Sequence, residues 1–516
     1  MKKYSFWFLC IFFILYLGLF SFQQIDLATA DLGRHLSNGN IFIHPEIANT
    51  QRSILLNTNF FSYTYPNNVF INHHWGSGII FYILYSLSGF EGLSLFYFLC
   101  IAGAIIMIIG AIKDDVDIKT LILCGLFITP LIASRTEVRP EGVSYFFLAF
   151  FFFFLYRFSK DKISWKYMFI LAATELLWVN MHIYFIFGIF LIGVFLFEAI
   201  LRKHTEQAKK LSIILVLTSI TTLINPYGLR AVTYPFTIFQ NYGYRVVENQ
   251  SIYFLENLSF NNPDFLWYKI CLCLVIVSNI FIVIKARKRF SIAPSILTFT
   301  FAILGYVGIR HISPFALLSF PLLVHNIYVI EQLYKKKISY DNIIIYYTFL
   351  IAFVLIITLI YFFQRLPWNR NFGLGLTPGS LDSITFIQKH NLVGPIFNNY
   401  DIGGLAIFAL FPREKVFVDN RPEAYPKNFF SDIYIPMQEN EVIWNAELKK
   451  ENFNVIFFYR LDYTPWAQAF LIQRITDPAW APVFVDNKTI IFLRRTVKNE
   501  KIISTFELPK ELFTSE

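Results

Sequence analysis

The sequence predicts a polytopic α-helical membrane protein of about 11–13 spans with a C-terminal extracytoplasmic α/β domain. Of its 516 residues, 56% are hydrophobic and only 15% are charged, whereas soluble proteins carry about 25% charged residues. Apolar runs of about 15 to 22 residues recur along the chain, which is the length of a membrane helix. These observations exclude a disordered chain and argue against a wholly soluble protein.

The first apolar run, 4–22, follows Met-Lys-Lys. It is long for a signal peptide and no small-residue cleavage site follows it closely, so we expect an uncleaved span with a cytoplasmic N-terminus. The segment 76–89 is short, and it either crosses the membrane or lies as a helix at the outer surface. The other candidate spans are 92–112, 119–133, 141–157, 166–181, 183–201, 211–225, 266–284, 291–309, 312–330 and 342–363.

Positive charge predicts the topology. Four connections between spans are dense in Lys and Arg: 157–166, 202–210, 285–289 and 335–337. If all four are cytoplasmic, about eleven crossings follow and 76–89 does not cross. Residues 1–363 then form a transmembrane domain with a large first outside loop, 23–75. Residues 364–516 form an outside domain, periplasmic or extracellular, and we expect a bacterial inner membrane.

The C-terminal segment alternates short β-rich and helical stretches, which predicts an α/β sandwich. The expected strands are 395–397, 416–419, 455–459, 483–486 and 489–493, and the expected helices are 380–390, 404–410, 439–450 and 466–475. Asp419 ends one expected strand, with Arg421 two residues further on. Ligands of α/β sheets often bind at the carboxyl ends of strands, but a structural Asp–Arg pair would look the same.

Candidate catalytic and substrate-binding residues also lie near both ends of the first outside loop. Asp31 and His35 would share one helical face, where a carboxylate can act as a general base or hold a cation. The alternative is an ion pair at the membrane surface. His73 and His74 precede Trp75, which suits a membrane interface. Adjacent histidines do not form a helical metal-ligand pair, so we consider them as substrate contacts.

The connection 135–141 is the densest charge cluster between two spans. Arg135, Glu137 and Arg139 could form a phosphate clamp balanced by carboxylates, or a capping network at a helix start. Further polar residues expected outside are Glu248 and Arg310.

An ionisable residue inside a membrane span is a functional hypothesis by default, because an unpaired charge in lipid is costly. Glu175 and His182 lie seven residues apart in one apolar segment, with Trp178 between them. We expect both side chains to point into one cavity, unless they form a buried structural pair.

The order of these residues resembles the GT-C superfamily of integral-membrane glycosyltransferases, which includes protein O-mannosyltransferases, the aminoarabinose transferase of lipid A and oligosaccharyltransferases. The resemblance covers most of the chain. It rests on the C-terminal α/β domain and on Asp31-Leu-Gly-Arg-His35-Leu, Phe61-Ser-Tyr-Thr64, His74-Trp75, Arg135 with Arg139-Pro-Glu141, and Asn180-Met-His182.

Members of this superfamily transfer a sugar from a polyprenyl-phosphate or polyprenyl-diphosphate donor on the extracytoplasmic side. By resemblance, Asp31 is the candidate catalytic residue and the outside arginines hold the donor phosphate. Two departures matter. Asp31 is followed by Leu32, where protein O-mannosyltransferases tend to have Glu. The Trp-Trp-Asp-Tyr-Gly motif of oligosaccharyltransferases has only the echo Asn399-Tyr400-Asp401-Ile402-Gly403, so sequon recognition does not carry over.

The resemblance implies an inverting glycosyltransferase that uses Asp31 as the base and moves a sugar to a lipid, glycan or protein acceptor. His35, His73 and His182 would orient hydroxyl groups. A divalent cation could bind Asp31, Glu137 and Glu248, although no spacing demands one. Membrane lipid is an expected partner and nucleic acid is not.

The alternative function is a transporter or flippase for a lipid-linked glycan, although the halves of the chain show no internal repeat of the kind that transporters commonly contain. A third reading is a structural component of an envelope complex, which would explain the C-terminal domain but not the polar residues.

Overall fold

The computed structural model describes residues 3–238, 242–334, 340–365 and 371–513, and they form two compact units that are each discontinuous in sequence. The membrane unit contains Met1–Gln24, Ser94–Phe236 and Val246–Leu374. The α/β unit contains Ile25–Leu93, Thr237–Arg245 and Gly375–Glu516. Most of the predicted first outside loop therefore folds in the same unit as the C-terminal segment. The domain boundary at residue 364 stays a prediction.

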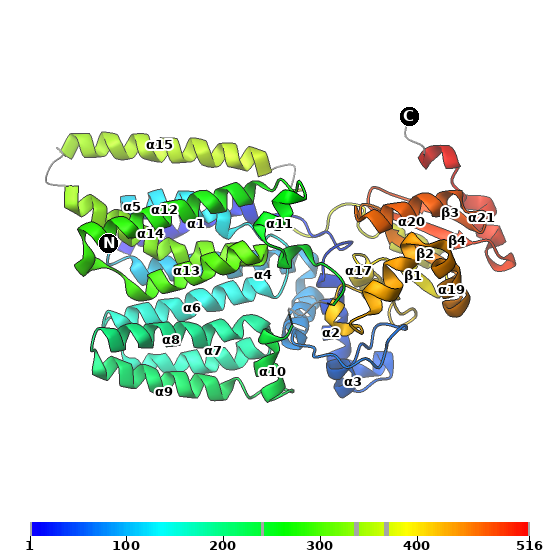
Figure 1. Ribbon diagram of the computed structural model, residues 1–516, viewed down its shortest axis with the longest axis horizontal. Helices are drawn as coiled ribbons and strands as arrows, with labels where there is room; N and C mark the ends of the chain where they lie inside the picture. Colours follow the sequence, from blue (N-terminus) through cyan, green and yellow to red (C-terminus); the bar gives the residue numbers. More distant parts are fainter. Residues whose placement is uncertain (1–2, 239–241, 335–339, 366–370, 514–516) are drawn as a thin grey trace. The chain divides into compact units, whose positions relative to one another are not determined.

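Helices dominate the membrane unit, and each predicted span overlaps one of them (Figure 1). They are α1 (Lys3–Ser21), the second part of α4 (Trp75–Ile112), α5 (Ile118–Ile132), α6 (Glu141–Ser159), α7 (Phe169–Val179), α8 (Ile186–Leu201), α9 (Thr205–Thr221), α12 (Pro263–Lys285), α13 (Ile292–Val307), α14 (Ile312–Tyr334) and α15 (Tyr340–Arg365). Two short helices, α10 (Leu229–Thr233) and α11 (Ile252–Asn257), lie in the connections. Within the unit, α14 packs against α5, α12 and α13.

Among the described residues, seven helical segments are long and apolar enough to cross a membrane. They are Tyr4–Ser21, Trp75–Ile112, Glu141–Ser159, Ile183–Leu201, Pro263–Lys285, Ile309–Tyr334 and Tyr347–Arg365. The apolar helices α5 and α13 are shorter. The expected class is confirmed: the chain is a helical integral membrane protein with a small C-terminal sheet. The topology stays a prediction, and the basic stretch 335–337 lies outside the described residues.

Local sequence explains where several helices begin and break. The side chain of Asp117 accepts a hydrogen bond from the amide of Thr120 at the start of α5, and Asn262 caps α12 in the same way, with Pro263 at its first position. α4 is interrupted at Ser88 and Gly89, where Gly89 has a φ of +64° that suits glycine. The uncertain segment 76–89 is therefore helical up to this break, and whether it crosses the membrane stays a prediction.

The α/β unit contains a four-stranded sheet in the order β1-β2-β4-β3. The strands are β1 (Ile396–Asn398), β2 (Val455–Tyr459), β3 (Trp480–Val485) and β4 (Thr489–Arg494). β1 and β2 are parallel, with Phe397 opposite Ile456, and the other pairs are antiparallel. The helices are α2 (Leu32–Ile43), α3 (Arg52–Asn57), the first part of α4, α16 (Asp382–Lys389), α17 (Gly403–Leu410), α18 (Pro436–Glu439), α19 (Glu441–Glu451), α20 (Pro465–Thr476) and α21 (Glu500–Phe506).

The strand expected at 416–419 is wrong. Val416 forms an isolated bridge with Ser62 of the first loop instead of joining the sheet. The contact with β1 is made by a side chain and not by backbone pairing. Asn398, the last residue of β1, accepts a hydrogen bond from the amide of Phe417 at 2.9 Å and donates one to the carbonyl of Val418 at 2.7 Å. The segment is extended, but its partners are a loop and a side chain.

The interior of the α/β unit is aromatic. Phe397 on β1 lies 5.2 Å from Trp444, 5.3 Å from Phe453 and 5.3 Å from Phe470, measured between ring centroids. All four side chains are buried. Aromatic pairs at such separations add to the free energy gained by burying their area. The core of this unit therefore fixes β1, and with it the residues that follow β1 in sequence.

Candidate functional site

Six charged side chains gather in the membrane unit, at helix ends and connections. Arg135, Glu137 and Arg139 lie between α5 and α6, and Glu141 is the first residue of α6. Glu248 lies in the short 3-10 helix Val247–Asn249 and Arg310 in the 3-10 helix Ile309–His311. Three arginines and three glutamates thus meet from three separate segments. Each side chain is at most 23% exposed.

Glu248 is the centre of this arginine cluster. One of its oxygens pairs with Arg135 and lies 3.5 Å from Arg310, and the other lies 2.5 Å from Arg139. Burial alone would raise the pKa of Glu248, but the three guanidinium groups hold it well below its usual range. Glu248 is therefore ionised at neutral pH.

The remaining glutamates complete the charge balance. Glu141 lies 3.3 Å from Arg135 and 3.6 Å from Arg310, and Glu137 lies 2.6 Å from Arg139. Burial would lower the pKa of Arg135, but Glu248 and Glu141 raise it well above its ordinary value. The cluster is a closed network in which each predicted phosphate-binding arginine already has a carboxylate partner.

The α/β unit carries a second charged group around the start of α2. Asp31 precedes this helix, and its carboxylate lies 3.9 Å from the guanidinium of Arg34. The backbone amide of His35 donates to the carbonyl of Asp31 at 3.2 Å, so the two residues have the predicted helical spacing. Burial lowers the pKa of Arg34, while Asp31 and Asp419 act in the opposite direction.

Asp419 and Arg421 form a buried ion pair. Arg421 donates to both oxygens of Asp419, at 2.7 and 2.6 Å, and to the side-chain oxygen of Asn59 at 2.9 Å. Its guanidinium also lies 4.8 Å from the ring centre of Phe70. The arrangement matches the structural alternative recognised from the sequence, and it ties the first loop to the C-terminal segment.

Asp401 extends this group with a further carboxyl. It follows β1 and lies within electrostatic range of Asp31 and Asp462. Burial, and after it the charges of Asp462 and Asp31, raise the pKa of Asp401 to about 7. Its neighbour Tyr400 stacks on Tyr244 with a centroid separation of 4.2 Å. The unit therefore presents a carboxyl that changes its charge near neutral pH.

Three of the four histidines of the first loop lie together. His35 on α2 contacts His74 with 5.1 Å between ring centroids, and His74 contacts His73 at 3.9 Å. His73 also places Nδ1 3.2 Å from the carbonyl oxygen of Ile71. The close approach of Gly39 on α2 to Gly78 on α4 brings these two helices into contact.

Glu175 and His182 have different surroundings in the membrane unit. The Glu175 carboxyl is buried against Gly188 and has no hydrogen-bond partner among the described residues. His182 places Nδ1 2.8 Å from the hydroxyl of Ser144, which accepts from Trp178. Tyr184 packs against His182 and stacks on His311, beside Arg310. His182 is thus linked toward the arginine cluster, and a cavity shared with Glu175 stays a prediction.

The sequence-based selection omitted Arg34, Glu141, Asp401, Glu423 and Asp462. Asp401 lies in the sequence echo noted above, and Glu141 lies within the dense 135–141 cluster, so both carried a signal. Glu423 lies two residues after Arg421, so it also carried a signal. Asp462 carried none, because its proximity to Asp401 depends on the tertiary structure. Burial raises the pKa of Glu423, while Arg34 and Arg421 oppose this shift.

Comparisons with known proteins found matches to this architecture only among solved structures. No family model matches the chain, and no curated protein matches it. Among solved structures, the archaeal oligosaccharyltransferase AglB from Archaeoglobus fulgidus matches over 93% of this chain and 73% of its own, with a TM-score of 0.61 and 13% identity. ArnT from Cupriavidus metallidurans matches over 98% of this chain and 100% of its own, with a TM-score of 0.52 and 11% identity.

The chain has the fold of the GT-C glycosyltransferases. The resemblance noted in the sequence is therefore confirmed at the level of fold. The AglB structure contains an inhibitory peptide and a dolichol-phosphate, and the ArnT structure contains undecaprenyl phosphate. Within the described part of this chain, no three His, Cys, Asp or Glu side chains group in a way that could hold a metal ion. Glu137 and Glu248 each hold arginines instead.

Proposed function

We propose that this chain transfers a sugar from a polyprenyl-phosphate donor to an envelope acceptor, at the extracytoplasmic face of a bacterial inner membrane. The fold shared with AglB and ArnT over most of the chain carries the proposal, since each of those structures contains a polyprenyl-type phosphate. The N-terminus would be cytoplasmic and the C-terminal segment periplasmic.

The arginine cluster of the membrane unit would bind the donor phosphate. Glu248 already occupies the position between three guanidinium groups where a negative charge is best stabilised. A donor phosphate would compete with or share this position, and Glu137, Glu141 and Glu248 keep the arginines oriented in its absence. As the bond to the sugar breaks, guanidinium groups stabilise the charge that develops on the leaving phosphate.

Asp31 would act as the general base. It takes the proton of an acceptor hydroxyl, whose oxygen attacks the anomeric carbon while the bond from that carbon to the phosphate oxygen breaks. The phosphate leaves with the electron pair, and one displacement inverts the anomeric configuration. His35, His73, His74 and His182 would orient hydroxyl groups. Asp419 and Arg421 would act as positioning residues.

The test measures sugar transfer by purified protein in native lipid extract, with a panel of radiolabelled polyprenyl-phosphate sugars. Asp31→Asn is compared with the wild type and with Glu46→Gln, which removes an exposed carboxylate from the same loop. A monodisperse elution profile confirms folding. We expect transfer by the wild type and Glu46→Gln and its loss in Asp31→Asn.

Transfer by a folded Asp31→Asn protein would refute the assigned base. Saturable donor binding without turnover in every protein would instead favour the transporter function.

The proposed binding of the donor phosphate by the arginine cluster is tested separately. Arg139→Gln is expected to raise the KM for the donor, and an unchanged KM would contradict donor binding by the arginines.

A further inference from the structure

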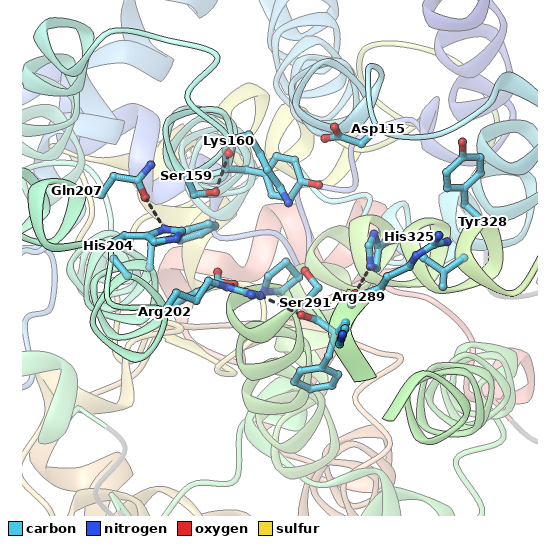
Figure 2. Close-up of a pocket in the computed structure, with 18 of the residues that line it drawn as sticks. Asp115, Ser159, Lys160, Arg202, His204, Gln207, Arg289, Ser291, His325 and Tyr328 are labelled. Atoms are coloured by element: carbon cyan, nitrogen blue, oxygen red, sulfur yellow. Dashed lines mark hydrogen bonds and ion pairs between the residues drawn. The ribbon is translucent and has the colours of Figure 1, made fainter. Parts of the chain in front are cut away.

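A pocket of about 690 Å³ lies in the membrane unit, and none of the six residues of the arginine cluster lines it. Figure 2 shows most of the residues that line it. They come from the connection between α4 and α5, the ends of α6 and α8, the start of α9, the connection between α12 and α13, the start of α13, and α14. Three of the four basic segments predicted to be cytoplasmic contribute to its wall: 157–166, 202–210 and 285–289.

Hydrogen bonds between separate elements fix the wall of this basic pocket. Arg202 at the end of α8 donates to the carbonyl of Phe290 at 2.9 Å and to Glu198 at 2.8 Å. His325 on α14 places Nε2 2.8 Å from the carbonyl oxygen of Arg289. The backbone of the α12–α13 connection is thereby held against two helices, while the side chain of Arg289 remains available.

The charge of the pocket is unbalanced. Its carboxylates are already engaged: Asp115 lies 2.7 Å from Lys162, and Glu198 pairs with Arg202. Three further lining cations, Lys160, Lys288 and Arg289, have no carboxylate partner within the part of the chain that the structure describes. An anion would therefore be attracted to the pocket.

The same pocket has an apolar part. Its lining includes Phe195, Leu211, Pro294 and Val329. A simple basic surface that only sets membrane orientation needs neither a cavity nor such a lining. Cations beside apolar walls suit a ligand with a phosphate group and an attached apolar portion, because Arg and Lys bind phosphate through charge-assisted hydrogen bonds.

We propose that this pocket binds a phosphate group, presented by an anionic lipid or by a soluble phosphate compound. The phosphate oxygens bind to Lys160, Lys288 and Arg289. Arg202 keeps the α12–α13 connection in contact with α8 through its hydrogen bond to Phe290. The site is separate from the arginine cluster, where every arginine already pairs with at least one glutamate. It does not depend on the proposed glycosyl transfer, and its test measures binding alone.

The experiment titrates purified protein in neutral detergent with inorganic phosphate, with dihexanoyl phosphatidic acid and with zwitterionic dihexanoyl phosphatidylcholine. The variant Lys288→Gln/Arg289→Gln removes two lining cations. The matched control Lys285→Gln/Arg287→Gln removes the same charge from exposed neighbours that do not line the pocket. Elution profiles and thermal midpoints establish that both variants fold.

We expect the lining variant to lose about tenfold or more in phosphate affinity, since charge-assisted hydrogen bonds are lost, and the control variant to keep its affinity. Binding of inorganic phosphate would indicate a soluble ligand, and binding of phosphatidic acid alone would indicate a lipid headgroup. Phosphatidylcholine binding as tight as that of phosphatidic acid, no binding by the wild type, or an equal loss in both variants would overturn the proposal.

Discussion

Arg139 on the connection between α5 and α6 places a guanidinium nitrogen 2.5 Å from a carboxylate oxygen of Glu248, which lies 109 residues further along the chain. This contact joins two connections of the membrane unit. Because Arg135 and Arg310 meet the same carboxylate, the position of each arginine depends on Glu248. The cluster is therefore organised by one acidic residue from a segment of little regular structure.

Replacing Glu248 with Gln should destabilise the membrane unit. Breaking a buried ion pair by removing one partner costs about 3–5 kcal/mol, because the opposite charges stay buried without compensation. The measurement is the thermal midpoint of purified protein in detergent. Glu256→Gln is the control, since Glu256 pairs with Lys269 at an exposed position, where such a pair contributes about 0–1 kcal/mol. Equal midpoints for the two variants would refute the central role of Glu248.

The contact between Gly39 of α2 and Gly78 of α4 predicts a second stability effect. A Cβ atom on Gly39 would overlap the carbonyl oxygen of Gly78, so Gly39→Ala should force the helices apart at a cost of about 1–3 kcal/mol. Gly193→Ala on α8 is the control, because nothing lies within 4 Å of a Cβ atom there. The thermal midpoint should fall only for Gly39→Ala. A fall for both variants would point to a general effect of replacing helical glycine.

The ion pair of Arg421 with Asp419 predicts that lysine cannot replace this arginine. Lysine has no planar fork and cannot serve both oxygens of Asp419 and Asn59 together. Arg421→Lys should therefore cost about 1–3 kcal/mol, the penalty of a buried polar group left without a partner. The comparison is Arg460→Lys, whose guanidinium donates to the carbonyl of Asp486 at an exposed position. Chemical denaturation of both variants checks the difference, and equal midpoints would contradict it.

The helical spans were predictable because an apolar run and its caps are local features of the sequence. The strand expected at 416–419 was not, because its true partners are Ser62 and the side chain of Asn398. Hydrophobic alternation predicts an extended segment, but it does not show whether that segment pairs with a strand of the sheet or with a loop.

The charged groups show the same limit. The charge density of 135–141 predicted that Arg135 and Arg139 bind a phosphate, and this role stays a prediction. The choice of Glu248 as their shared partner, and the approach of Asp31 to Asp401, depend on contacts between segments far apart in sequence. Such pairing is set by tertiary structure, which a single sequence does not reveal.

Asp401 provides a prediction about pH. Its pKa is raised to about 7 by burial, then by Asp462 and Asp31, whereas an unfolded Asp titrates near about 3.9. Between about pH 4 and pH 7 the folded state therefore binds more protons than the unfolded state, and stability falls as pH rises. Above pH 7 both states are ionised at this residue and the loss is complete.

Asp401→Asn should remove this fall, because the amide stays neutral at every pH. The variant is expected to exceed the wild type in stability by about 4 kcal/mol at pH 8, and the difference should disappear at about pH 4. Thermal midpoints measured between these values test the prediction. Glu439→Gln, at an exposed position of the same unit, should keep the slope of the wild type. Parallel curves for Asp401→Asn and the wild type would show that Asp401 stays ionised in the folded protein.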